Sequence, residues 1–317
     1  MTSAGVRPPF AGVGVADPPV GKPIRTDSII RKFLLWWFRQ PHGIAHVSLS
    51  ISIDMTHALA YLDRLAELDG PKVSVQHLLS GVIGRTLHHH PAANARIVGR
   101  RIVPVDSVAA AMPVNLLGHA GESTSELGMA LVEQLERRSL RDIADATRGA
   151  VKEERAGRSA NPFVGAMKAM ARRMPQRLLD QALDTMDRGM QSLPIASQVY
   201  DQFPVTTGLT NPGAALSNLE GARFMGGAFS LPQKLLHVGT LWGVSMITQD
   251  VMVVKGEVAV RPVLPMLLIF DHRLIDGVAA GRMLQFVVCV LQDPARWFGE
   301  DGRHPGPDPV DGALARA

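Results

Sequence analysis

The sequence predicts an α/β fold (α+β in the order of its elements), with helices packed on a β-sheet. Residues 46–54, HVSLSISID, alternate between apolar side chains and serines, which is the pattern of a half-buried strand. Helical patterns follow near 56–68 and 73–89, and Pro91 ends the second helix. An apolar run, LPMLLIF at 264–270, has the length of a buried strand. The chain has 317 residues, 46% of them hydrophobic, which is enough for a sizeable core.

Composition predicts one folded region between two tails. Residues 1–25 are rich in Pro and Gly, and 299–317 are similar, so we expect the domain to span 26–298. Cys289 is the single cysteine, which excludes a disulfide framework and a cysteine-based metal site. The start lacks the apolar core of a signal peptide, so we expect a cytoplasmic location. The net charge of +4 is mild and favours an anionic partner without naming one. We expect no nucleic-acid partner.

Three further segments have distinct local patterns. Residues 95–114 predict a short hairpin and another strand, and 251–260 predict a hairpin with a Lys-Gly turn. Ser123 and Glu126 have the spacing of a capping box, so we expect a long helix from there to about residue 154.

The segment from about 160 to 205 predicts an inserted, Met-rich helical region, divided by Pro175. Its apolar residues recur at helical spacing: Met167, Met170, Met174, Leu178, Met186 and Met190. This stripe has two interpretations. It is the insertion's own core, or it is an adaptable apolar lid, because Met side chains conform to varied partners.

The stretch FDHRLIDG at 270–277 carries the chemistry that the sequence predicts. Asp271, His272, Arg273 and Asp276 follow the apolar run directly, and small residues then begin a helix. A histidine at a strand end is often only a polar terminus, but a neutral imidazole there is suited to proton transfer near pH 7. The triplet at 88–90 is different. Three consecutive histidines on a helix point in different directions, so we predict no metal site.

Several segments together resemble the catalytic domain of the 2-oxoacid dehydrogenase acyltransferases, the E2 components. The resemblance runs from about 28 to 298 and is carried by RK (31–32), PH (41–42), SIDMT (52–56), KVSVQHLLSGVIGRTLHHHPAANA (72–95), ALSNLEG (215–221), DHRLIDG (271–277) and QDP (292–294). It implies a chloramphenicol acetyltransferase-like two-layer sandwich with a mixed sheet. The bare H-x-x-x-D-G pattern also occurs in condensation domains and wax-ester synthases, so the flanking segments provide most of the specificity.

The resemblance implies site residues, substrates and an assembly. His272 would be the general base, Ser217 the hydrogen-bond donor to the oxyanion, and Asp276 a supporting residue. The substrates would be coenzyme A or acyl-CoA and an acyl acceptor; residues that bind coenzyme A are not predicted. The family's unit is a homotrimer, in which His272 of one subunit would face Ser217 of its neighbour.

Departures from the family pattern leave alternatives open. This sequence shows no lipoylation loop, so we expect any lipoamide to be supplied by another chain. The apolar helix RKFLLWWFRQ at 31–40 favours a core or interface face, with a peripheral membrane or carrier-protein contact as the alternative. An O- or N-acyltransferase of the wax-ester or antibiotic-modifying type would use the same histidine. A non-catalytic E2-like scaffold would need neither His272 nor Ser217.

Overall fold

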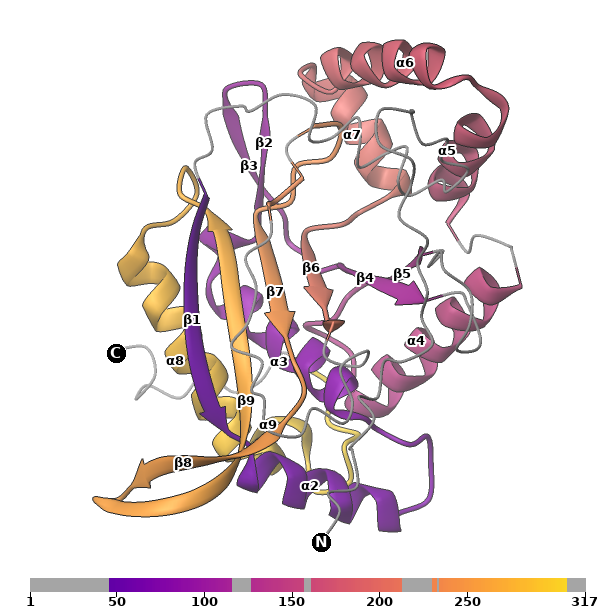
Figure 1. Cartoon of the computed structure of the whole chain (residues 1–317). Coiled ribbons are helices and arrows are strands. Elements are labelled where there is room, and N and C mark those ends of the chain that lie inside the picture. Colours follow the sequence, from indigo (N-terminus) through magenta and orange to yellow (C-terminus); the bar gives the residue numbers. More distant parts are fainter. Residues whose placement is uncertain (1–45, 116–126, 157–160, 213–229, 233, 307–317) are drawn as a thin grey trace, which may run out of the picture.

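The protein is described here by a computed structural model, covering residues 46–115, 127–156, 161–212, 230–232 and 234–306. Within these residues, seven strands form one mixed sheet in the order β1-β9-β7-β6-β4-β5, with β8 paired to β9 (Figure 1). The pairs β4–β6 and β6–β7 are parallel and the others are antiparallel. The strands are β1 (His46–Asp54), β4 (Ala110–Asn115), β5 (Leu127–Val132), β6 (Thr207–Thr210), β7 (Thr240–Val244), β8 (Thr248–Val254) and β9 (Glu257–Asp271). The predicted α/β class with a mixed sheet is confirmed.

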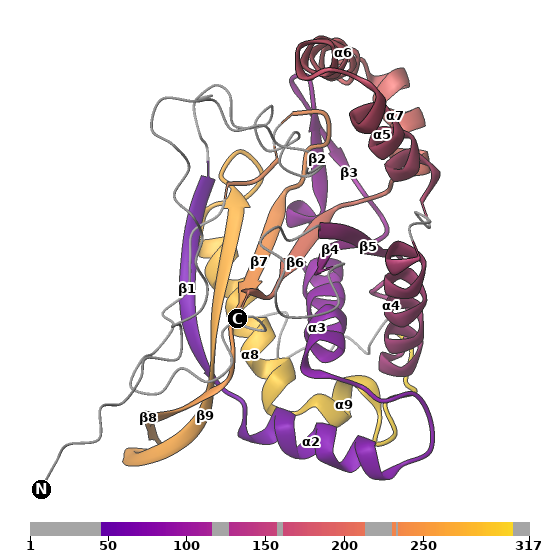
Figure 2. The same cartoon turned by 45° about the vertical axis from the view of Figure 1, so that its right-hand side comes forward.

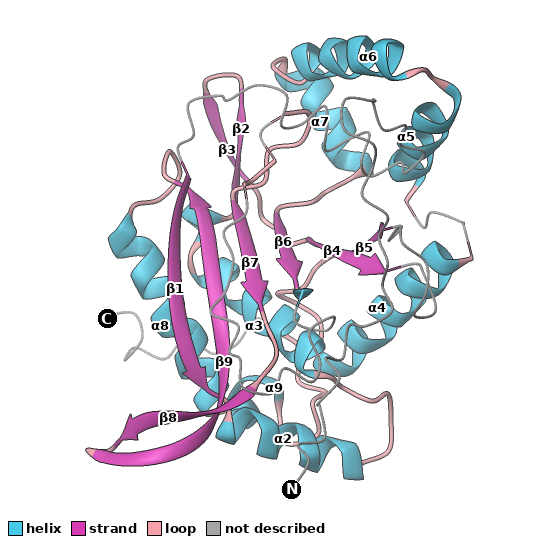
Figure 3. Cartoon of the chain, in the orientation of Figure 1, coloured by secondary structure: helices cyan, strands magenta, loops and turns pink. Residues whose placement is uncertain are grey.

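Helices cover one face of this sheet, which gives the two layers (Figures 2 and 3). These helices are α2 (Thr56–Glu67), α3 (Val75–His89), α4 (Leu140–Arg155), α8 (Gly277–Gln292) and α9 (Pro294–Phe298). A 3₁₀ turn (Pro91–Ala93) leads from α3 into a separate hairpin of β2 (Ala95–Val98) and β3 (Arg101–Pro104). The helices predicted near 56–68 and 73–89 and this hairpin are confirmed.

The long strand β9 is central to the sheet. It pairs with β1 along the whole of β1, from His46 opposite Asp271 to Asp54 opposite Val263. The serines of β1 are exposed and its apolar residues turn inward, as the alternation predicts. The last six residues of β9, Met266 to Asp271, are all buried. The carboxylate of Asp271 therefore lies at the buried end of the strand.

The insertion forms three helices, α5 (Pro162–Arg173), α6 (Gln176–Gly189) and α7 (Leu193–Gln202), with Pro175 between the first two as predicted. Met167 and Met190 are buried with Leu179 and Leu183 in a cluster that also includes Val98 of β2 and Leu235. Leu178, expected in the same stripe, is instead 54% exposed. The stripe therefore packs inward, which favours the interpretation of an internal core over that of a lid.

Two expectations along the chain are wrong. Residues 127–132 form β5, paired with β4, where a helix from Ser123 was expected; α4 begins only at Leu140, behind a capping box of Ser139 and Asp142. Residues 299–306 pack on the domain, where a tail was expected. The Tyr61 hydroxyl donates to the Gly299 carbonyl at 2.7 Å, and Gly302 is buried.

The hairpin of β8 and the start of β9 extends beyond the rest of the sheet (Figure 1). Its turn is Lys255-Gly256, as predicted, and both residues have positive φ, 54° and 87°. Val251 pairs with Val260, and Val253 with Val258. These four side chains are 63–76% exposed. We call them the valine patch, because directly paired residues lie on one face of a hairpin.

Two observations bear on the other expectations. Among the described residues, no helix combines the length and apolar character needed to cross a membrane. The apolar helix expected at 31–40 lies outside the described residues.

Glycine 84 allows α3 to approach the segment before α4 closely. A Cβ at this position would lie 2.7 Å from the backbone carbon of Leu135, too near for either segment to remain in place. Gly149, in α4, has nothing within 4 Å of such a Cβ. The two helical glycines are therefore a matched pair for substitution.

We expect Gly84→Ala to lower the free energy of unfolding by ~1–3 kcal/mol, as overpacking does. Gly149→Ala should raise it by ~0.5–1 kcal/mol, because alanine is the better helix former and meets no neighbour. Urea unfolding of the two variants and the wild type measures both changes. Stabilisation by Gly84→Ala would contradict the packing of α3 described here.

Candidate active site

A tight turn follows the buried end of β9 and carries His272. The Asp271 carbonyl accepts a hydrogen bond from Leu274 N–H at 2.9 Å, which closes the turn. The Asp271 side chain accepts from Arg273 N–H, also at 2.9 Å, through Oδ1. His272 therefore lies between Asp271 and Arg273, which are hydrogen-bonded to each other. Its own side chain is exposed, with its ring centroid 6.0 Å from that of Phe270.

The other two predicted site residues have different outcomes. Asp276 is the N-cap of α8, and its Oδ1 accepts from Ala279 N–H at 2.8 Å. It thus ends the turn that begins at Asp271, and His272 lies between the two. Ser217 lies outside the described residues, so the structure gives no distance from it to His272.

The Asp271 carboxylate is fully buried and paired with Arg273. Arg273 Nε lies 2.9 Å from Oδ1 and 3.2 Å from Oδ2, and Nη2 also donates to Oδ2. Burial alone would raise the pKa of this carboxyl, but hydrogen bonds from Arg273 and His237 outweigh it and hold the pKa well below its usual range. The carboxylate is therefore charged at neutral pH.

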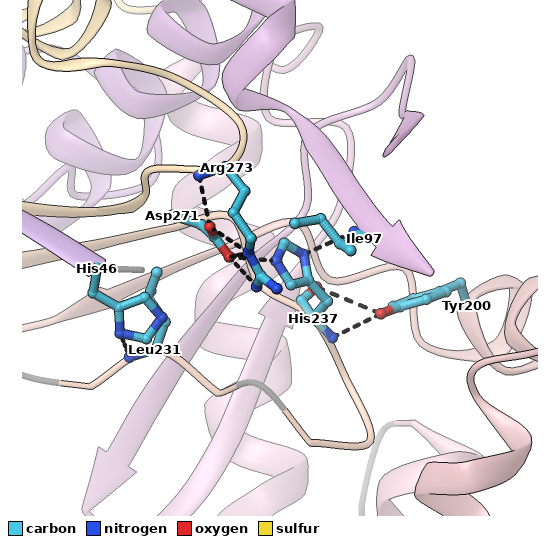
Figure 4. A network of polar contacts seen from close by, with 7 residues as sticks. All are labelled: His46, Ile97, Tyr200, Leu231, His237, Asp271 and Arg273. Carbon is cyan, nitrogen blue, oxygen red and sulfur yellow. Dashed lines mark hydrogen bonds and ion pairs between the residues drawn. The ribbon is translucent and has the colours of Figure 1, made fainter. Parts of the chain in front are cut away.

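His237, which lies just before β7, is a second buried partner of Asp271 (Figure 4). Its Nε2 lies 3.0 Å from Asp271 Oδ2. Its Nδ1 accepts a hydrogen bond from the backbone N–H of Ile97 in β2, at 3.1 Å. An accepting Nδ1 carries no proton, so in the neutral ring the proton is on Nε2 and is donated to the carboxylate.

Two more residues from distant segments complete this network. The Tyr200 hydroxyl, from α7, accepts from the backbone N–H of His237 at 2.8 Å. The Arg96 guanidinium lies over the Tyr200 ring, 3.9 Å from its centroid, and its Nη2 donates to the Val205 carbonyl at 3.1 Å. The insertion and the β2–β3 hairpin therefore both contact His237.

His46, at the start of β1, borders the network from the other side of β9. It is paired in register with Asp271, and its Nδ1 accepts from Leu231 N–H at 3.4 Å. Burial lowers the pKa of His46, while the charge of Asp271 opposes this shift. His46 and His237 were missed from the sequence. The available signal for His237 was a histidine within the apolar stretch LLHVG at 235–239.

The site has the chemistry of an acid–base centre. Among the described residues, no group of three or more His, Cys, Asp and Glu side chains could hold a metal ion. The exposed imidazole of His272 lies on a turn held by the pair of the buried Asp271 carboxylate and the half-exposed Arg273. An exposed imidazole can exchange a proton with a bound molecule.

Comparison with known families supports an assignment. The family model of the 2-oxoacid dehydrogenases acyltransferase (catalytic domain) matches residues 36–165 and 236–299, together more than half of the chain. The second segment includes His272 and Asp276. Ser217 lies between the two segments, outside the match.

Curated relatives match over shorter stretches. The succinyltransferase component of the 2-oxoglutarate dehydrogenase complex of Bartonella vinsonii subsp. berkhoffii is 33% identical over 89 residues, which are 26% of this chain and 22% of that protein. The acetyltransferase component of the pyruvate dehydrogenase complex of Bacillus subtilis is 40% identical over 52 residues, 16% of this chain and 12% of that protein. The matched region thus spans about a fifth or less of these relatives.

Solved structures share the fold over almost the whole chain. The cubic core of a pyruvate dehydrogenase multienzyme complex aligns with a TM-score of 0.60 and 18% identity, covering 91% of this chain and 98% of that one. The dihydrolipoamide acetyltransferase of Azotobacter vinelandii, in which a serine, a histidine and an asparagine were investigated for roles in catalysis, aligns with a TM-score of 0.57, also at 18% identity, covering 91% and 98%. With a family match over more than half its length and this shared fold, the chain belongs to the family of 2-oxoacid dehydrogenase acyltransferase catalytic domains.

Proposed function

We propose that this protein is an acyltransferase that moves an acyl group between coenzyme A and a thiol acceptor, with His272 as the general base. The observation that carries the proposal is the exposed imidazole of His272 on a turn held by the buried Asp271–Arg273 pair. A catalytic base needs access to its substrate and a fixed orientation, and this turn provides both.

In the proposed reaction, the His272 ring takes the proton of the attacking thiol. A free thiol has a pKa of ~8.5, so at neutral pH little thiolate forms without a base. The sulfur forms a bond to the thioester carbonyl carbon, and the carbonyl oxygen becomes an oxyanion, to which Ser217 would donate a hydrogen bond. The intermediate then breaks its bond to the departing sulfur, which receives the proton from His272. Asp276 supports the turn as the cap of α8 and exchanges no proton.

The proposed substrates and assembly follow the family. Acyl-CoA is the donor or product, and a dihydrolipoyl group carried by another chain is the proposed physiological acceptor. The proposed unit is a homotrimer. The valine patch supports it, because four paired and exposed valines on a projecting hairpin are an apolar surface suited to contact with a second copy. A cytoplasmic setting is proposed from the single cysteine.

His272→Ala should lower turnover ~10²–10⁴-fold, the usual contribution of a positioned base. The melting temperature should be unchanged, because the side chain is exposed. The assay follows transfer from acetyl-CoA to dihydrolipoamide by chromatography. His57→Ala, which removes an exposed histidine from α2, is the control and should keep full activity. Turnover of His272→Ala within threefold of wild type would remove the proposed mechanism.

Asp271→Asn should destabilise the protein at neutral pH, because Arg273 loses its anionic partner. Breaking a buried pair costs ~3–5 kcal/mol, and the lower end applies here since the Arg273 side chain is 46% exposed.

The effect of Asp271→Asn should also depend on pH. A lowered carboxyl pKa stabilises the folded state above the unfolded value, near ~4, and this contribution is lost as the pH falls below it. The difference between wild type and variant should therefore be ~1 kcal/mol smaller at pH 3 than at pH 7. Urea unfolding at both pH values measures it. Equal differences would show that the charge of Asp271 is not involved.

Replacing both Val251 and Val260 by lysine should convert the trimer to monomers, because two charges would enter the proposed interface. Light scattering reports the mass, and circular dichroism reports folding. Leu178→Lys, at an exposed position of α6, is the matched control and should remain trimeric. A monomeric wild type would contradict the proposed trimer, and a trimeric double variant would exclude the valine patch from the interface.

A further inference from the structure

We propose that His237 is a positioning residue for the reaction: it holds Asp271, and through Asp271 the turn that carries His272, in one orientation set by β2 and α7. This inference rests on the proposed role of His272. His237 does not contact the reacting groups in this arrangement; it acts through the Asp271 carboxylate.

The Asp271 carboxylate accepts hydrogen bonds from donors inside its own turn and from one donor outside it. Oδ1 accepts from Arg273 twice, from the backbone N–H and from Nε. Both bonds lie within the turn itself, so they cannot fix the turn relative to the rest of the domain. The His237 Nε2–Oδ2 contact at 3.0 Å comes from a segment 34 residues away. It is a side-chain contact that ties the carboxylate to another segment of the domain (Figure 4).

His237 is itself held in place by two neighbouring segments. Its ring nitrogen Nδ1 is engaged by the Ile97 N–H of β2, and its backbone N–H by the Tyr200 hydroxyl of α7. Close by, Asp271 N–H donates to the Gly239 carbonyl at 3.0 Å. A Cβ at Gly239 would lie 3.1 Å from the Ala95 carbonyl oxygen, so the backbones of these segments are already in contact. The His237 ring is thus bonded at both nitrogens, Nδ1 to Ile97 and Nε2 to Asp271, and its backbone is bonded to Tyr200.

Without the bond from His237, the Asp271 carboxylate could shift, and the position of His272 would change with it. Arg273 is half exposed and its guanidinium is bonded to the Asp271 carboxylate, so a shift of that carboxylate would be passed on to Arg273. His272 lies between these two residues and would move with them. A displacement of ~1 Å from reactive geometry can cost ~10²-fold in rate. The effect falls on turnover and spares substrate binding, because His237 is buried away from solvent.

Two variants of similar polarity separate positioning from stability. His237→Gln can place an amide N–H near the position of Nε2 and keep the bond to Asp271. His237→Asn is shorter; its amide oxygen can replace Nδ1 toward Ile97, but it leaves Oδ2 without this donor. We expect His237→Asn to lower kcat ~10–100-fold with KM for acetyl-CoA within threefold of wild type. His237→Gln should keep kcat within fivefold.

Controls make the outcome specific. Tyr61→Phe removes the partly buried hydrogen bond from α2 to the Gly299 carbonyl, and it should lower the melting temperature without lowering kcat. Equal losses in the Gln and Asn variants, or kcat of the Asn variant within threefold of wild type, would overturn the inference. If His272→Ala is inactive while the Gln and Asn variants do not differ, the role of His237 is wrong and the proposed function stands.

A spectroscopic readout is independent of folding of the variants and of activity. Long-range ¹H–¹⁵N correlation spectra of the wild-type protein report which ring nitrogen of each histidine is protonated. The His237 signals, assigned by their absence from the Gln variant or from selectively labelled protein, should show a protonated Nε2 and a bare Nδ1. A protonated Nδ1 would exclude the bond to Asp271 as described and overturn the inference.

Discussion

The charge of Asp271 is the constraint on which the geometry of this site depends. A carboxylate removed from water needs partners for its oxygens, and an unpaired one would cost several kcal/mol. Here the chain provides donors from two places: the turn itself through Arg273, and the segment before β7 through His237. The backbone N–H of Asp271 separately donates to the Gly239 carbonyl. The requirement to satisfy one buried charge thus defines the path of the chain on both sides of His272.

The same requirement explains why the surroundings of the turn are drawn from distant parts of the sequence. β1 lies against Asp271 through His46, β2 contributes the N–H of Ile97, and α7 contributes the hydroxyl of Tyr200. The apolar cluster of the insertion includes Val98 of β2 and Leu235, and Tyr200 belongs to it and also contacts His237. The inserted helices are therefore attached to the site by a polar contact as well as by packing.

Most of the sheet could be predicted from the sequence because its signals are local. The alternation of 46–54, the apolar run at 264–270 and the Lys-Gly turn each describe their own structure without knowledge of a partner. The strand at 127–132 could not be predicted in this way. LGMALV is compatible with a helix, and its pairing with β4 decides its conformation. The cap-like Ser123 and Glu126 reinforced the wrong interpretation.

The candidate site divides in the same manner. The places of His272 and Asp276, between a buried strand end and a helix start, could be predicted from one short motif. Their roles in catalysis stay predictions. His237 was not, because its role arises from contacts with Asp271 and Ile97, 34 and 140 residues away. For the Met-rich stripe, the secondary structure could be predicted but the contacts of its apolar face could not. Its periodicity predicted helices correctly, but periodicity alone does not say whether an apolar face meets its own domain or a ligand.

The pairing of β1 with β9 links errors of folding to errors of chemistry. Side chains of a strand alternate between its faces, so a shift of one residue would turn the serines of β1 inward and its apolar residues toward water. A shift in one direction would bring Val47, in place of His46, opposite the end of β9. A misregistered chain would therefore be unstable, and different side chains would lie beside the turn that carries His272. The cost of exposing apolar side chains, which disfavours the wrong register of β1 and β9, therefore also fixes which residues surround His272.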